Sequence, residues 1–155
     1  MPRPLVWIVR GLLACALVSS TLLPTEASEA QRPRYAPVAI RDVRVVSNRT
    51  LEPPLRAAME EALAAMDVVS VHPTPQAGYV LDASITQLET ESMTVGRRID
   101  CEVSIVVEDA RRHAVRGVLT GRAHVIGDAG PALELAAVRA AARGAIRSLP
   151  TAIAR

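Results

Sequence analysis

Residues 99–108 (IDCEVSIVVE) decide the fold of this chain. Apolar side chains occupy the odd positions, and all but one of the even positions are polar or charged. Because successive side chains of a β-strand point to opposite faces, this alternation predicts a strand with one buried face and one face in water. The expected buried face consists of Ile99, Cys101, Val103, Ile105 and Val107.

Residues 115–126 (VRGVLTGRAHVI) are the expected antiparallel partner of this strand, after a loop over residues 110–114. Side-chain charge selects the register of the hairpin. The favoured register pairs Glu108 with Arg116, Glu102 with Arg122, Asp100 with His124 and Val106 with Val118. A slip of two residues loses these cross-strand contacts, each worth about 0.2–1 kcal/mol.

Two helices are expected to cover the buried face. The first follows Pro53-Pro54, because proline is tolerated in a first helical turn. Its apolar stripe is Leu55, Met59, Ala62, Leu63 and Met66. The second begins near Pro131, with Asp128 as its N-cap, and ends at Pro150. Its apolar stripe is Leu135, Val138, Ala142, Ala145, Ile146 and Leu149. Gly117 and Gly121 fall on the inner face of the hairpin, where glycine allows this helix to approach closely.

Three further strands complete the predicted sheet. Residues 38–46 form a strand whose apolar phase changes at Arg41-Asp42, which predicts a β-bulge. Residues 68–71 form a short edge strand, and residues 79–88 (YVLDASITQL) alternate again. The order β-α-(β)-β-β-β-α predicts an α+β domain, a mixed β-sheet of four to five strands with two helices packed on one face.

The N-terminus predicts export. Arg3 and Arg10 precede an apolar run over residues 11–23, and small residues follow at the expected cleavage positions, after Ala27 or Ala30. An uncleaved anchor is the first alternative, but the clean apolar run falls short of the roughly 20 residues that a spanning helix needs. A lipoprotein signal with a lipidated Cys15 is the second, but apolar residues follow Cys15 instead of a polar tether. We expect a signal peptide over residues 1–30, a flexible arm over 31–37 and a single α+β domain over 38–155, periplasmic or secreted.

Composition argues against several classes of function. All 18 basic residues are arginine and nearly balance the 16 acidic residues, which gives no basis for a nucleic-acid partner. There is no Phe, and Trp7 lies in the expected signal peptide, so no platform for stacking bases is expected. Cys101 is the only cysteine outside that peptide, so no intramolecular disulfide is expected.

Residues 78–86 (GYVLDASIT) carry a resemblance to known proteins. They are similar to the strand A-D-Y-(V/L)-L-x-G-x-I of a group of bacterial envelope domains. This group includes the lipoprotein activators of penicillin-binding proteins, the periplasmic domain of the curli secretion channel and the N-terminal domain of the Tol-system propeller protein. Gly78 stands where the group has Asp, and Ala83 where it has Gly. The resemblance covers most of the mature chain in element order and implies a binding or assembly module.

Few residues have the pattern of a catalytic or metal site. His72, His113 and His124 lack metal-ligand spacing, and Cys101 lies among inward positions without a neighbouring base. Asp100, Glu102 and Glu108 are explained by the basic residues that face them across the hairpin. Residues 127–130 (GDAG) lack the lysine of a phosphate loop. We therefore expect no catalytic residue, no cofactor and no metal.

Docking of a partner is the favoured function. Val106 and Val118 form an apolar spot among charges on the wet face, and a basic patch surrounds the hairpin tip. The predicted partner-binding residues are Val106, Val118, Arg111, Arg112 and Arg116. We expect a non-catalytic binding or assembly module of the cell envelope, with an envelope protein as its partner and no integral membrane span in the mature chain. The alternative is a periplasmic small-ligand carrier with a cleft between the helices and the sheet.

Overall fold

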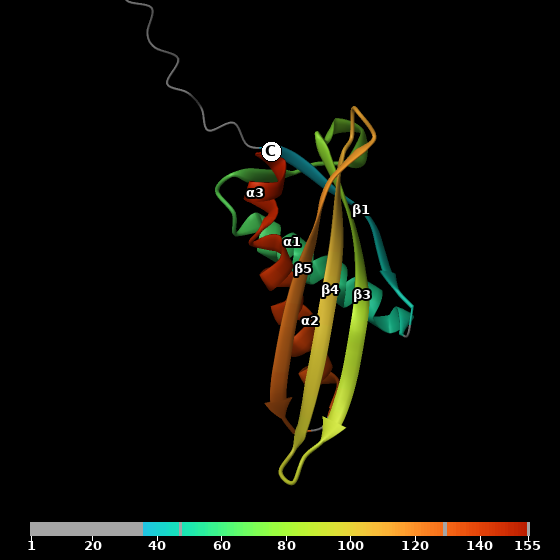
Figure 1. Ribbon diagram of the computed structural model, residues 1–155, viewed down its shortest axis with the longest axis vertical. Coiled ribbons are helices and arrows are strands. Elements are labelled where there is room, and N and C mark those ends of the chain that lie inside the picture. Colours follow the sequence, from blue (N-terminus) through green and yellow to red (C-terminus); the bar gives the residue numbers. More distant parts are fainter. Residues whose placement is uncertain (1–35, 47, 129, 155) are drawn as a thin grey trace, which may run out of the picture. The chain divides into compact units, whose positions relative to one another are not determined.

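A computed structural model describes residues 36–46, 48–128 and 130–154 of the chain (Figure 1). The expected signal peptide, and residues 31–35 of the expected arm, lie outside the described residues. No helix within these ranges is both long and apolar enough to cross a membrane.

A mixed sheet of five strands forms the centre of the fold. In chain order the strands are β1 (Ala36–Val45), β2 (Val69–Val71), β3 (Tyr79–Ser92), β4 (Arg97–Asp109) and β5 (Ala114–Gly127). In space the order is β2-β1-β3-β4-β5. β1 runs parallel to β2 and β3, whereas β3, β4 and β5 form an antiparallel meander.

Helices α1 (Glu52–Ala64), α2 (Pro131–Ile146) and α3 (Leu149–Ile153) lie on one side of this sheet (Figure 1). Two short 3-10 turns, Arg49–Leu51 and Thr74–Gln76, precede α1 and β3. The architecture confirms the predicted α+β class, including the short edge strand β2 and the β-bulge of β1, which falls between Ile40 and Asp42.

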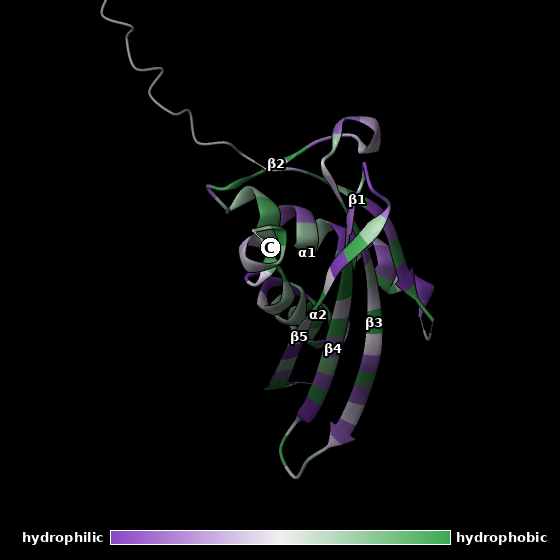
Figure 2. Ribbon diagram, turned by 45° about the horizontal axis from the view of Figure 1, so that its top comes forward, coloured by the Kyte–Doolittle hydropathy of each residue, from purple (hydrophilic) through white to green (hydrophobic). Residues whose placement is uncertain are grey.

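The core is built mainly on the apolar residues that alternate with polar ones along β4. Its five odd residues from Ile99 to Val107 are each no more than 3% exposed. Hydrophobic and hydrophilic bands alternate along β3 and β4 (Figure 2). Leu55, Met59 and Leu63 of α1 pack against this face and are fully buried. Burying one such side chain stabilises the fold by about 1.5–3 kcal/mol.

α2 approaches the sheet closely, as the glycines of β5 predict. A Cβ atom on Gly121 would lie 2.0 Å from the carbonyl oxygen of Ala141 and 2.4 Å from the backbone nitrogen of Ala145. Both distances are far below van der Waals contact. Only glycine therefore fits at position 121 with the helix where it is.

The predicted hairpin register is confirmed from Arg97, opposite Gly127, to Val107, opposite Gly117. Glu102 therefore faces Arg122, and Val106 faces Val118. The expected pair of Glu108 with Arg116 is wrong. A bulge between Val107 and Glu108 places Glu108 opposite Val115, and the Arg116 side chain binds Asp109 instead, with Nη2 2.9 Å from Oδ2.

The predicted ends of the second helix also need correction. Gly130 is the N-cap of α2 in place of Asp128, so the first turn has no side-chain cap. Leu133 is buried, whereas Leu135 is 38% exposed. Pro150 does not end the helix. It lies in the first turn of α3, after a break at Arg147-Ser148.

β3 is longer than predicted and extends past β1. The β1 ladder ends where Val45 faces Ile85, whereas β3 continues to Ser92. Beyond that point the sheet has three strands, made of residues 86–92, 97–102 and 122–127. We call this part the three-stranded end. It forms the lower part of the sheet in Figure 1.

Candidate functional site

The candidate site is the face of the sheet that the helices leave uncovered. The even residues of β4 point to it, and the hairpin register places Asp82, Val106 and Val118 in one row across β3, β4 and β5. Val118 is 59% exposed, and Val106 is half-buried. The predicted apolar spot therefore exists as a side-by-side pair.

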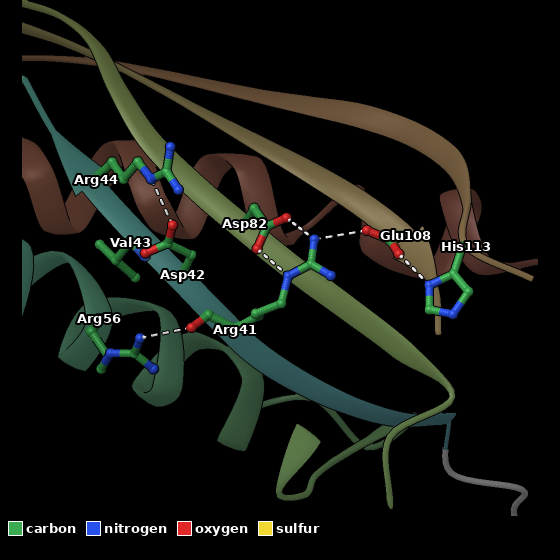
Figure 3. A network of polar contacts seen from close by, with 8 residues as sticks. All are labelled: Arg41, Asp42, Val43, Arg44, Arg56, Asp82, Glu108 and His113. Atoms are coloured by element: carbon green, nitrogen blue, oxygen red, sulfur yellow. Dashed lines mark hydrogen bonds and ion pairs between the residues drawn. The ribbon is translucent and has the colours of Figure 1, made fainter. Parts of the chain in front are cut away.

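Figure 3 shows an ionic network on this face. It lies beside the valine pair, because Asp82 is opposite Val106 in the sheet. Arg41 sits at the bulge of β1, and its side chain crosses the face toward β3 and β4. Its Nε donates to Asp82 Oδ1 over 3.0 Å, and its Nη2 donates to Glu108 Oε2 over 2.7 Å. The guanidinium thus joins three strands that are adjacent in the sheet and far apart in the sequence.

These contacts shift the pKa values of the charged groups in the network. Hydrogen bonds from Arg41, and then from His113, hold the pKa of Glu108 below its usual value. His113 Nδ1 lies 3.3 Å from Glu108 Oε1, at a turn where His113 adopts a φ of 51°. Asp82 and Glu108 together raise the pKa of Arg41. A carboxylate that is ionised and already bound to arginine has no proton to donate, so this network suits structural pairing better than acid catalysis.

The three arginines of the predicted basic patch have different environments in the structure. Arg111 and Arg112 are exposed on the turn, but their backbone N–H groups both donate to Asp109 Oδ1, at 3.0 and 3.1 Å. The Arg116 side chain donates to Oδ2, the other oxygen of the same carboxylate. The Arg116 contact, followed by the backbone N–H groups, lowers the pKa of Asp109. Arg111 and Arg112 remain available at the hairpin tip, whereas Arg116 is occupied within the chain.

Cys101 lies in the core and is 3% exposed. Burial raises the pKa of its thiol to about 11, so the thiol stays protonated at neutral pH. Within the described residues, no group of three or more His, Cys, Asp or Glu side chains is arranged to hold a metal ion.

Sequence reasoning missed Arg41 and Asp82, which form the centre of the network. The phase change at Arg41-Asp42 predicted the bulge, but not that the bulge would direct Arg41 over the neighbouring strands. Residue spacing offers no such signal, because Arg41, Asp82 and Glu108 meet only through the order of strands in the sheet.

The fold has solved neighbours. PelC from Paraburkholderia phytofirmans, solved as a dodecamer, matches with a TM-score of 0.59 and 16% identity over 75% of this chain and 88% of that one. A PelC variant in a second crystal form matches with a TM-score of 0.60 and 16% identity, over 75% and 89%. Lipoprotein GNA1162 from Neisseria meningitidis matches with a TM-score of 0.51 and 9% identity, over 77% and 95%.

At these identities the likeness establishes the fold alone. No protein family matches the sequence, and no curated protein is similar enough in sequence to count as a relative. The more specific resemblance, to activators of penicillin-binding proteins and the curli and Tol domains, stays a prediction.

Proposed function

We propose that this chain is an exported, non-catalytic binding or assembly module of the cell envelope, which docks an envelope protein on the uncovered sheet face. The pair of Val106 and Val118 is the observation that carries the proposal. Two valines side by side in water, within a charged surround, have the pattern of a small interface with an apolar centre and a polar rim.

The charged surround favours docking because it is already internally paired. Asp82 and Glu108 are held by Arg41, and Glu102 is held by Arg122. A partner that covers the valines need not supply new counter-charges for these carboxylates, so their desolvation costs less than that of isolated charges. The exposed Arg111 and Arg112 at the hairpin tip extend the proposed surface.

Two further observations support an envelope role. The expected signal peptide directs export, and the fold is shared with PelC and with a lipoprotein. PelC was solved as a dodecamer, which supports an assembly role for this fold.

Photo-crosslinking in the native envelope tests the docking surface. The sequence has no lysine for amine-reactive reagents, so a photoreactive residue is placed at Val118. We expect the photoreactive residue to capture one protein. The additional substitution Val106→Arg should abolish that capture without lowering the melting temperature of the chain. The matched control places the photoreactive residue at Leu135, an exposed apolar position on α2, where we expect no capture. Equal capture from both positions would contradict a docking role for the sheet face.

The small-ligand carrier remains the alternative function. The space between helices and sheet, where its cleft was predicted, is filled by fully buried side chains such as Leu55, Met59 and Ile105. A hollow of about 400 Å³ lies instead on the helical side, with an apolar floor that includes Met66 and Ile146. A thermal-shift screen with envelope metabolites separates the two functions, because only a carrier gains stability from a small molecule.

A further inference from the structure

The three-stranded end of the sheet has an open edge on each side. On one side, β1 stops pairing with β3 at Ile85, and among the described residues no strand borders residues 86–92 of β3 on that side. On the other side, β5 is the last strand of the sheet. Open strand edges carry unpaired backbone N–H and C=O groups and readily pair with another chain.

Side chains of α1 contact the backbone of β1 beyond its short pairing with β2. The described residues place no such contact on the two open edges of the three-stranded end. Arg56 of α1 donates to the carbonyl oxygen of Ile40 over 3.1 Å, and Glu52 accepts from the N–H of Val45 over 3.4 Å. In the part of the chain that the structure describes, no hydrogen bond outside the ladder with β4 reaches the backbone of residues 120–127.

The two open edges carry opposite charges on the same face of the sheet. Register places Gln87, Glu102 and Arg122 in one row across the three strands. Glu89, Asp100 and His124 form the next row, and Glu91, Arg98 and Ile126 the one after. Each row thus runs from the β3 edge to the β5 edge. We call Glu89 with Glu91 the acidic edge, and Arg122 with His124 the basic edge.

Among the described residues, the two glutamates of the acidic edge are not fully compensated by positive charge. Glu89 faces Asp100, a like charge, and Asp100 is itself bound to Arg98. Glu91 faces Arg98 but forms no ion pair with it, and among the described residues neither glutamate has an ion-pair partner within 4.0 Å. Like charges directly opposite each other destabilise a sheet, so a positive charge at this edge is favourable. Arg122 contacts Glu102 but is 79% exposed at its side chain, which leaves its outer side free.

We propose that copies of this chain associate head to tail, with the basic edge of one copy against the acidic edge of the next. β3 and β5 run parallel to each other because both are antiparallel to β4. A second copy in the same orientation therefore brings its β3 alongside β5 in the parallel direction, with both uncovered faces on the same side. Such an interface joins two different surfaces, so it repeats from copy to copy and closes into a ring or continues as a filament.

Pairing of two β5 edges is the competing arrangement. It would bring Arg122 and His124 of one copy close to the same residues of the other, without an acidic residue on β5 to compensate them. The proposal concerns a surface apart from the Val106 and Val118 spot, so either can fail while the other holds.

The test is the mass of the purified chain in solution at two ionic strengths, measured by light scattering. At about 0.01 M salt the Debye length is about 30 Å, and at about 1 M it is about 3 Å. We expect assemblies larger than a dimer at low salt and monomers at high salt. A chain that stays monomeric at low salt at every concentration reached would overturn the proposal.

Two edge variants distinguish a head-to-tail contact from a two-fold one. Glu89→Lys with Glu91→Lys removes the acidic edge, and Arg122→Gln with His124→Gln removes the basic edge without placing a carboxylate against Glu102. Each variant alone should be monomeric at low salt. An equimolar mixture should form heterodimers and nothing larger, because each partner keeps one working edge.

Matched controls exclude a general effect of charge. Two control variants change charge at exposed positions outside the three-stranded end: Glu60→Lys on α1, and the double variant Arg111→Gln with Arg112→Gln on the hairpin tip. Both should assemble like the unmodified chain. Unchanged melting temperatures establish that the edge variants are folded. Assembly that persists in the basic-edge variant would indicate β5 to β5 pairing, because the loss of Arg122 and His124 removes the like-charge repulsion of that arrangement. A mixture without heterodimers would rule out the head-to-tail contact. Capture at Val118 by the monomeric variants tests docking separately.

Discussion

Gly121 is the residue that sets the distance between α2 and the sheet. Any larger residue has to push away the backbone of Ala141 and Ala145, which lies within 2.4 Å of the position of the missing Cβ. Backbone cannot move aside as the end of a flexible side chain can, so the whole helix must shift.

We therefore predict that Gly121→Ala destabilises the protein by about 1–3 kcal/mol, the usual cost of overpacking a core. Gly117 is the matched control on the same strand and face, because a Cβ there meets only the Ala152 Cβ at 3.9 Å. Gly117→Ala should be neutral or stabilising by up to about 0.5–1 kcal/mol, since glycine weakens a strand. Denaturant unfolding of both variants measures the difference. Equal effects at the two positions would mean that the close approach of α2 does not limit position 121.

At the scale of the element, the hairpin of β4 and β5 illustrates what a sequence can predict. Alternation identified β4, and the charges of Glu102 and Arg122 selected a register that holds as far as Val107 and Gly117. The prediction failed at Glu108 because Arg116 has two consecutive carboxylates within reach. Only the bulge decides that Arg116 binds Asp109 and leaves Glu108 to Arg41. Charge pairing along one hairpin contains no information about a third strand.

The ends of α2 were unpredictable for a local reason. Asp128 has the preferred chemistry of an N-cap, but Pro131 fixes the start of the helix and Gly130 occupies the cap position.

At the candidate site, the pairing of Val106 with Val118 followed from the register. Their role in binding, and that of Arg111, Arg112 and Arg116, remains a prediction.

The pair of Glu102 and Arg122 provides a prediction at this scale. Their side chains are 2.5 Å apart, and Arg122 is largely exposed. Exchanging the two charges, with Glu102→Arg and Arg122→Glu together, should restore most of the stability that either reversal loses. The coupling should be under about 1 kcal/mol because solvent screens an exposed pair. A double-mutant cycle measures it at low ionic strength, with the protein dilute enough to stay monomeric, because salt screens an exposed ion pair. A coupling of zero within error would contradict the pairing.

At the scale of the whole molecule, we predict that the chain is exported and cleaved. The apolar run over residues 11–23 is followed by small residues, which predicts a mature N-terminus at Ser28 or Gln31. Intact-mass measurement of the exported protein checks this. A mass that corresponds to a diacylated Cys15 start, or retention of the whole chain in the membrane, would refute it.

β3 changes character along its length, and this has a consequence for native-state hydrogen exchange. Up to Ile85 it is an interior strand between β1 and β4, and from there to Ser92 it has β4 as its only neighbour among the described strands. Amides in the first half exchange only when much of the sheet opens, whereas those in the second half exchange through small local fluctuations. The backbone that opens most easily is therefore concentrated in the three-stranded end, and the half that holds Arg41, Asp82 and the valine pair stays rigid.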